Sequence, residues 1–66
     1  MTDLMKGILS RVLSEEIAHQ ENWAKDDEMR GYGGAIRRDN IIKDIREFMK
    51  DNEIEFREDF YYNELR

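Results

Sequence analysis

The chain has only 66 residues and no cysteine, and these two facts limit how it can become stable. A domain of this length buries only about 60% of the surface of its extended chain, so a monomer is marginally stable. Disulfides and cysteine-ligated zinc or iron–sulfur centres, which stabilise many small proteins, are excluded. Self-association is the remaining common device. We therefore expect a single domain, residues 1–66, that forms a homo-oligomer, most simply a homodimer.

The composition also bears on the cellular compartment of the protein. No apolar stretch approaches the roughly 20 residues needed to span a bilayer, and no N-terminal segment has the pattern of a secretory signal. We expect a cytoplasmic protein with no membrane partner. Its formal net charge of −5, with 41% charged residues, predicts good solubility and repulsion from nucleic acid and anionic lipid.

Helix-favouring residues dominate the chain, and no proline interrupts them. Apolar residues at spacings of three and four predict a first helix over about residues 3–25, capped by Thr2 or Asp3. A second periodic segment predicts a helix over about residues 28–51. Two helices joined by a short turn centred on Asp27 must lie antiparallel. The predicted fold class is therefore all-α, an antiparallel helical hairpin.

The two apolar stripes can be aligned across this turn. They contain Met5, Leu9, Val12, Glu16, His19 and Trp23 in the first helix, and Gly31, Ala35, Arg38, Ile42, Ile45 and Met49 in the second. The alignment places Trp23 opposite Gly31, so that the glycine makes room for the indole. It also places Glu16 opposite Arg38, so that the only two charges interrupting the stripes form an ion pair. We assign structural roles to these four residues.

Both stripes are too wide for one hairpin to cover. The flanking apolar residues are Leu4, Ile8, Leu13 and Ile17 in the first helix, with Ile41 and Phe48 in the second. A second hairpin would bury them. We therefore expect two chains to dimerise into a four-helix bundle.

The glycine-rich stretch Gly31–Gly34 is the first candidate for a chemical site. Phosphate-binding loops follow G-x-x-x-x-G-K-[ST] or G-x-G-x-x-G directly after a strand, and this stretch matches neither pattern. A structural use is favoured, in one of two forms. The glycines lie inside the second helix, which we prefer, or they form a hinge that delays this helix to about Gly34, since glycine costs about 1 kcal/mol at each helical position.

Glu16 and His19 form an E-x-x-H motif, which supplies two ligands from one helix in di-iron carboxylate bundles. A dimer of hairpins would offer the four helices required. The facing residue is Arg38, however, and a guanidinium beside a metal cation is electrostatically unfavourable. We therefore expect no metal and no other cofactor, and keep a metal-binding bundle as the alternative function.

Catalysis and nucleic-acid binding are both disfavoured. With one histidine, no cysteine and two serines, Ser10 and Ser14, the chain lacks a nucleophile and base pair, so we expect no catalytic residues and no enzyme activity. Residues 30–46 carry five basic against two acidic side chains and could meet phosphates. No nucleic-acid-binding motif is legible there, so a nucleic-acid-associated regulator is the third hypothesis.

The C-terminal element, about residues 53–65, reads as a short helix in preference to a lone strand without a visible partner. It combines aromatic with acidic side chains. Some aromatics can cap the open end of the hairpin, and those left exposed among acids suit docking to a basic protein surface, including one that normally binds nucleic acid. The candidate partner-binding residues are Phe56, Glu58, Asp59, Phe60, Tyr61 and Tyr62.

Residues 28–49, and above all the stretch "MRGYGGAIRRDNIIKDIREFM", resemble short helical proteins encoded by bacteriophages and prophages. In these, an arginine–glycine pair opens a helix that continues with an alanine–isoleucine step and an isoleucine-rich stripe. The resemblance implies a homo-oligomeric accessory protein in the host cytoplasm, of a class several of whose members bind and block a host protein. We therefore expect a non-enzymatic, acidic protein-interaction module.

Overall fold

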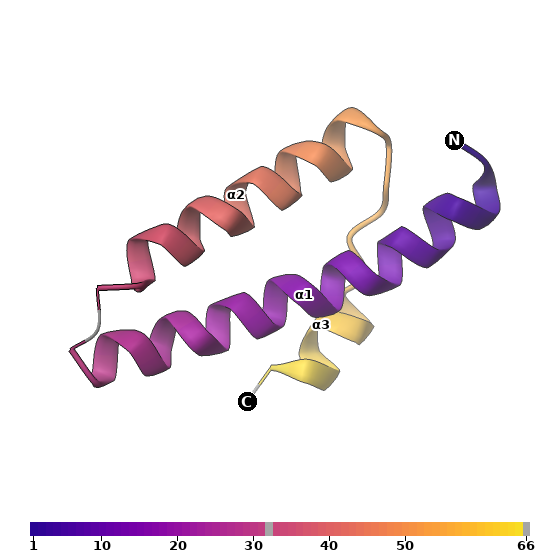
Figure 1. Ribbon diagram of the computed structural model, residues 1–66. Helices are drawn as coiled ribbons and strands as arrows, with labels where there is room; N and C mark the ends of the chain where they lie inside the picture. Colours follow the sequence, from indigo (N-terminus) through magenta and orange to yellow (C-terminus); the bar gives the residue numbers. More distant parts are fainter. Residues whose placement is uncertain (32, 66) are drawn as a thin grey trace.

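The computed structural model describes residues 1–31 and 33–65, and every regular element within them is a helix. The elements are α1 (Asp3–Met29), α2 (Ala35–Asp51) and α3 (Glu58–Glu64). Helix α2 runs antiparallel to α1, and the chain then crosses α1 so that α3 lies on another side of it (Figure 1). The prediction of an all-α hairpin with a short C-terminal helix is confirmed.

Helix α1 is longer than predicted because Asp26 and Asp27, at the centre of the predicted turn, continue the helix instead. The side chain of Thr2 accepts a hydrogen bond from the Met5 amide (3.2 Å), as predicted for an N-cap. At the other end, an acid in the last turn of a helix is ordinarily unfavourable. The carboxylate of Asp27 is compensated there by Arg38 of α2, whose Nε donates to Asp27 Oδ2 (2.7 Å).

The glycines form the turn, so the prediction that they lie inside the second helix is wrong. Gly31 takes φ = +75°, a left-handed conformation that ends α1, and α2 begins only after Gly34. A Cβ on Gly31 would meet nothing within 4 Å, and Trp23 is 45% exposed, so Gly31 makes no room for the indole. The hinge alternative is the one realised. A Cβ on Gly34 would meet the carboxylate of Asp27, so a larger residue there would move that side chain away from its present position beside Arg38.

The later turn shifts the pairing of the two helices. Arg38 meets Asp27, three helical turns beyond the Glu16 that the predicted alignment placed opposite it. Arg38 Nη1 also donates to Gln20 Oε1 (3.2 Å), and Gln20 Nε2 donates to Glu16 Oε1 (2.9 Å). Glu16 is thus joined to Arg38 only through Gln20, and the predicted direct ion pair is wrong.

Half of the α1 stripe predicted to face α2 is exposed, at Met5, Val12 and Trp23, whereas Leu9 of that stripe packs against the core. Met5 and Val12 are about half exposed, whereas Leu13 and Ile17, which were predicted to flank the stripe, pack in or against the core. The buried apolar residues are Ile17, Ala18, Ile42, Met49 and Ile54. Compared with the predicted alignment, α1 turns a different side toward α2. Residues 54–57 occupy one side of α1, and α2 packs beside them.

Gly31→Ala should lower the free energy of unfolding by about 1–2 kcal/mol, because a left-handed conformation strains any residue with a Cβ. Gly33→Ala is the matched control, since a Cβ there would meet nothing within 4 Å. The control should be neutral or slightly stabilising. Urea unfolding followed by circular dichroism measures both.

Trp23→Ala combined with Gly31→Ala tests the corrected pairing. The two costs should add, because no contact joins these residues. Coupling above about 0.5 kcal/mol would show that the glycine packs against the indole and would contradict this arrangement.

Candidate functional site

Two serines of α1 position the C-terminal segment that completes the candidate site. Ser10 Oγ donates to the carbonyl of Glu55, and Ser14 Oγ accepts from the amide of Arg57 (2.9 Å) while donating to the carbonyl of Ser10 (2.6 Å). Both serines are buried. Small side chains let the extended backbone of residues 54–57 approach α1 closely, which is why α3 follows α1 toward its C-terminal half.

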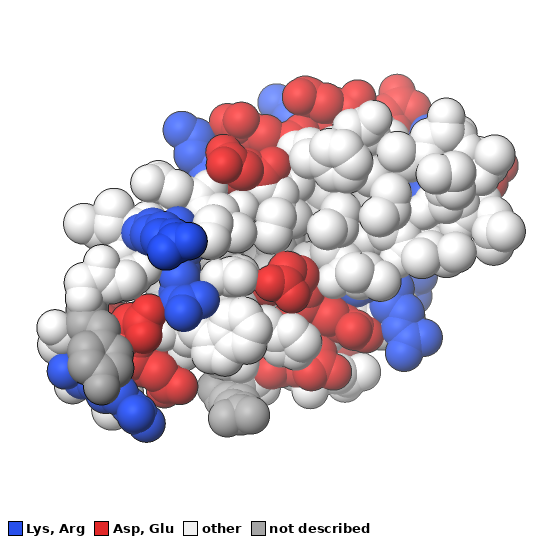
Figure 2. Space-filling model, in the orientation of Figure 1, with Lys and Arg blue, Asp and Glu red and all other residues white. Residues whose placement is uncertain are grey.

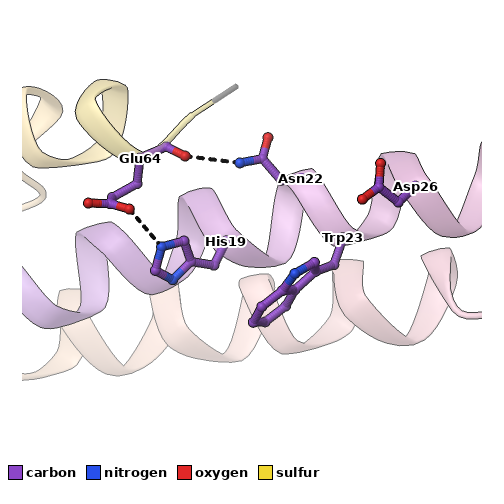
Figure 3. Close-up of a pocket in the computed structure, with 5 residues that line it drawn as sticks. All are labelled: His19, Asn22, Trp23, Asp26 and Glu64. Carbon is purple, nitrogen blue, oxygen red and sulfur yellow. Dashed lines mark hydrogen bonds and ion pairs between the residues drawn. The ribbon is translucent and has the colours of Figure 1, made fainter.

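The candidate site is a hollow of about 200 Å³ between the C-terminal half of α1 and the end of α3 (Figure 3). It is lined by His19, Asn22, Trp23, Asp26 and Glu64. Four of these residues come from α1 at spacings that place them on one side of the helix, and Glu64 is the last residue of α3. Asn22 Nδ2 donates to the Glu64 carbonyl (3.0 Å) and holds the two elements together.

His19 links the two helices through its imidazole. Its Nε2 lies 2.9 Å from Glu64 Oε2, and its Nδ1 lies 3.8 Å from Glu16 Oε2. The hydrogen bond to Glu64 raises the pKa of His19 above its ordinary value of 6.5, against a smaller opposing effect of burial, and the charges of Glu64, Glu16 and Glu15 add to the rise. Protonation of His19 therefore strengthens the attachment of α3 to α1.

Trp23 contributes a half-exposed indole to the hollow. His19 packs against it, with ring centroids 5.8 Å apart, and the guanidinium of Arg38 lies 5.3 Å from the indole centroid. Asp26 follows Trp23 by nearly one helical turn and is exposed. Within residues 1–31 and 33–65, the side chain of Asp26 forms no hydrogen bond or ion pair. The sequence did not single out Asn22, Asp26 or Glu64 as a site. Helical spacing relates residues within one helix and does not show that the end of α3 lies against α1.

The predicted partner-binding residues divide between core and surface. Phe56 and Tyr61 pack against the core and against each other, with ring centroids 5.2 Å apart. Tyr61 donates its hydroxyl hydrogen to Glu21, and this bond raises the pKa of Tyr61 to about 12. Phe60 is half-buried and lies near two guanidinium groups, those of Arg11 (5.1 Å) and Arg57 (4.9 Å).

The remaining three candidates, Glu58, Asp59 and Tyr62, are exposed on α3. Arg57 donates to both carboxylate oxygens of Asp59 (3.2 and 3.0 Å), and this interaction lowers the pKa of Asp59. The surface that these residues offer is therefore acidic at Glu58, locally neutralised at Asp59 and aromatic at Tyr62.

Metal and nucleic-acid sites have limited structural support. Within the described part of the chain, no group of three or more His, Asp or Glu side chains could hold a metal ion, so Glu16 and His19 would need further ligands from a second chain. In the basic segment 30–46, Arg38 and Arg46 pair with Asp27 and Glu21. In Figure 2 the Lys and Arg side chains lie in separate groups, most of them beside Asp and Glu, and form no continuous basic field on this face.

No protein-family model, curated protein or solved structure matches this chain. Among the helices of residues 1–31 and 33–65, none combines the length and apolarity needed to cross a bilayer.

Glu64→Gln should lower the melting temperature more at about pH 5.5 than at about pH 8.5. The pKa of His19 is raised in the folded state, so the stability due to its interaction with Glu64 is fully present below pH 6.5 and is lost as the pH rises through the folded-state pKa. Thermal melts at both pH values provide the measurement. Asp44→Asn, an exposed substitution on α2, should change the melting temperature by the same amount at both pH values. If the effect of Glu64→Gln were also the same at both pH values, the role of His19 would be contradicted.

Proposed function

We propose that this protein is a non-enzymatic interaction module that self-associates through one apolar side of its hairpin and docks a basic protein surface with its acidic side. The first part is carried by a single observation, the uncovered apolar side of α1 and α2. The second part rests on the exposed acidic and aromatic residues around α3.

The uncovered side has the composition of a protein interface. We name the apolar part of this uncovered side the open face. It consists of five exposed residues: Leu4, Met5, Ile8 and Val12 on α1 with Phe48 on α2. Leu4 is 75% and Ile8 is 55% exposed. The space-filling view has a broad uncharged area over this end of the hairpin (Figure 2). Several large apolar side chains exposed at one end of a hairpin are typical of an interaction site.

The size and shape of the chain support a second copy as the occupant. Its accessible surface is 5029 Å², whereas a compact monomer of 8.0 kDa exposes about 4,500 Å². The chain therefore exposes roughly 500 Å² more than a compact monomer of its mass. The radius of gyration is 12.7 Å, against about 10.8 Å for a compact domain of this length.

Two copies of a flat hairpin can cover each other. The Cα atoms span 42 × 22 × 12 Å, so the hairpin is a thin layer that another layer would turn into a two-layer domain. A two-fold axis near Ile8 would place one open face on the other and leave the charged half of each α1 outside the interface. The product is the four-helix bundle expected from the sequence, with α3 on its outside.

Ile8→Lys should convert the dimer to a monomer at micromolar concentration. Each dimer would lose two buried isoleucines, a cost of about 3–6 kcal/mol, which weakens association at least 100-fold. Light scattering coupled to size-exclusion chromatography provides the measurement. Ile36→Lys is the matched control, because Ile36 is 77% exposed but lies on the first turn of α2, at the other end of the hairpin. A wild-type monomer, or equal effects of the two variants, would refute self-association.

The charge distribution supports a basic protein as the second partner. The chain has a net charge of −5, and α3 presents Glu58 beside the exposed aromatic ring of Tyr62. Aromatic groups anchor protein interfaces, and complementary charge steers association and suppresses wrong partners. A basic surface that normally binds nucleic acid would be blocked by such a module. The resemblance of residues 28–49 to phage-encoded accessory proteins supports this inhibitory role.

Tyr62→Ala together with Glu58→Lys should abolish capture of the basic partner from nuclease-treated bacterial lysate, because the variant loses the aromatic anchor and reverses a charge. Mass spectrometry identifies proteins captured by the wild type, and binding of the purified partner confirms the interaction. Ile36→Lys, which lies away from α3, should capture the same protein. Capture of the same set by all three proteins would refute this docking surface.

A further inference from the structure

The hollow between α1 and α3 contains an aromatic surface that accepts cations. Trp23 is the only tryptophan of the chain and remains 45% exposed. The indole already has one guanidinium near it, that of Arg38, whose charge is balanced by Asp27 at 2.7 Å. A tryptophan ring attracts a cation placed over its face more strongly than other aromatic rings do.

Carboxylates from two different helices border the same hollow. Asp26 comes from α1 and has no side-chain partner in the part of the chain that the structure describes. Glu64 comes from α3 and directs one carboxylate oxygen to His19. Asp26 and Glu64 lie on opposite flanks of Asn22 in Figure 3, with the indole of Trp23 below. The hollow therefore combines an aromatic face with two negative charges.

We propose that this hollow binds an arginine side chain of the basic partner, with the guanidinium stacked on Trp23 and paired with Asp26, while Glu64 adds negative charge at the other end of the hollow. The identity of the arginine's source rests on the proposed function, whereas the affinity of the hollow for a guanidinium does not. A guanidinium fits this combination better than an ammonium does. It is planar, so it stacks on an indole, and it donates two parallel hydrogen bonds to one carboxylate.

The volume and charge of the hollow agree with this ligand. About 200 Å³ accommodates a guanidinium with the methylene groups next to it, and the opening to solvent lets a partner's side chain enter from outside. With His19 neutral, the lining residues carry the two charges of Asp26 and Glu64, and Glu15 and Glu16 add negative charge nearby. The charge of Arg38 on the α2 side is matched by Asp27.

His19 makes this binding depend on pH. Its protonated form places a positive charge in the hollow and engages Glu64, so it competes with an arriving guanidinium. Affinity for arginine should therefore be lower at about pH 5.5 than at about pH 8. The same protonation that attaches α3 more firmly to α1 would weaken ligand binding.

The fluorescence of Trp23 reports binding directly, because the chain has no other indole. The probe is N-acetyl-arginine amide, and the control ligand is N-acetyl-citrulline amide, which has nearly the same shape without the charge. We expect a saturable change with the arginine compound, with a dissociation constant of about 1–10 mM for one isolated side chain. The citrulline compound should give no saturable change. N-acetyl-lysine amide should bind more weakly than the arginine compound.

Asp26→Asn should weaken binding of the arginine probe about five-fold, as expected from the loss of about 1 kcal/mol for a solvent-accessible charge pair. Asp44→Asn on α2 is the matched control and should bind as the wild type does. The shift of the Trp23 indole N–H signal in NMR spectra checks that each variant is folded and that the probe contacts this ring. Equal responses to arginine and citrulline, or wild-type affinity in Asp26→Asn, would overturn the proposal.

The same titration on the Ile8→Lys variant separates this inference from the proposed function. The hollow lies on the C-terminal half of α1, away from the open face, so the variant should bind the probe as the wild type does. Loss of binding in this variant would overturn a site built within one chain. Retained probe binding without capture of any basic protein would count against the proposed function alone.

Discussion

Two hydrogen-bonded serines determine how the other elements are arranged around α1. Ser10 holds the backbone of Glu55, and Ser14 holds that of Arg57, so an extended segment lies directly on the helix. The hydroxyls satisfy backbone groups that close packing would otherwise leave without partners. Because this segment occupies one side of α1, α2 packs on the neighbouring side, and nothing in the described residues 1–31 and 33–65 covers the remaining side of α1.

The uncovered side connects the architecture with the proposed function. A helix that contacts two other segments from one chain can bury only part of its circumference, and here the residues left out include Ile8 and Val12. The chain is consequently thin and elongated and has more surface than its mass requires. The same packing that completes the monomer thus creates the surface on which a second copy would complete the core.

The C-terminal segment also assembles the hollow. Helix α3 runs along α1 toward its C-terminal half and brings Glu64 to His19 and Asn22, residues that are more than 40 positions away in the sequence. The indole of Trp23, predicted to be buried inside the hairpin, instead lies at the border of this hollow. One short helix therefore supplies the exposed acid and aromatic groups of the proposed docking surface and one wall of the proposed arginine site.

The sequence by itself determined the helical class and the antiparallel hairpin, because these follow from local periodicity and the absence of proline. It limited the N-cap to Thr2 or Asp3 and favoured a C-terminal helix over about residues 53–65, of which the structure makes Glu58–Glu64 helical. It did not determine where the turn lies. Two acids and a glycine cluster were both acceptable turn sequences, and only the tertiary pairing of Asp27 with Arg38 stabilises the acids at the end of α1. Nor did periodicity decide which side of α1 faces α2. Helical spacing shows which residues share a side, but several sides of α1 carry apolar or small residues, and the serines that hold the C-terminal segment decided between them.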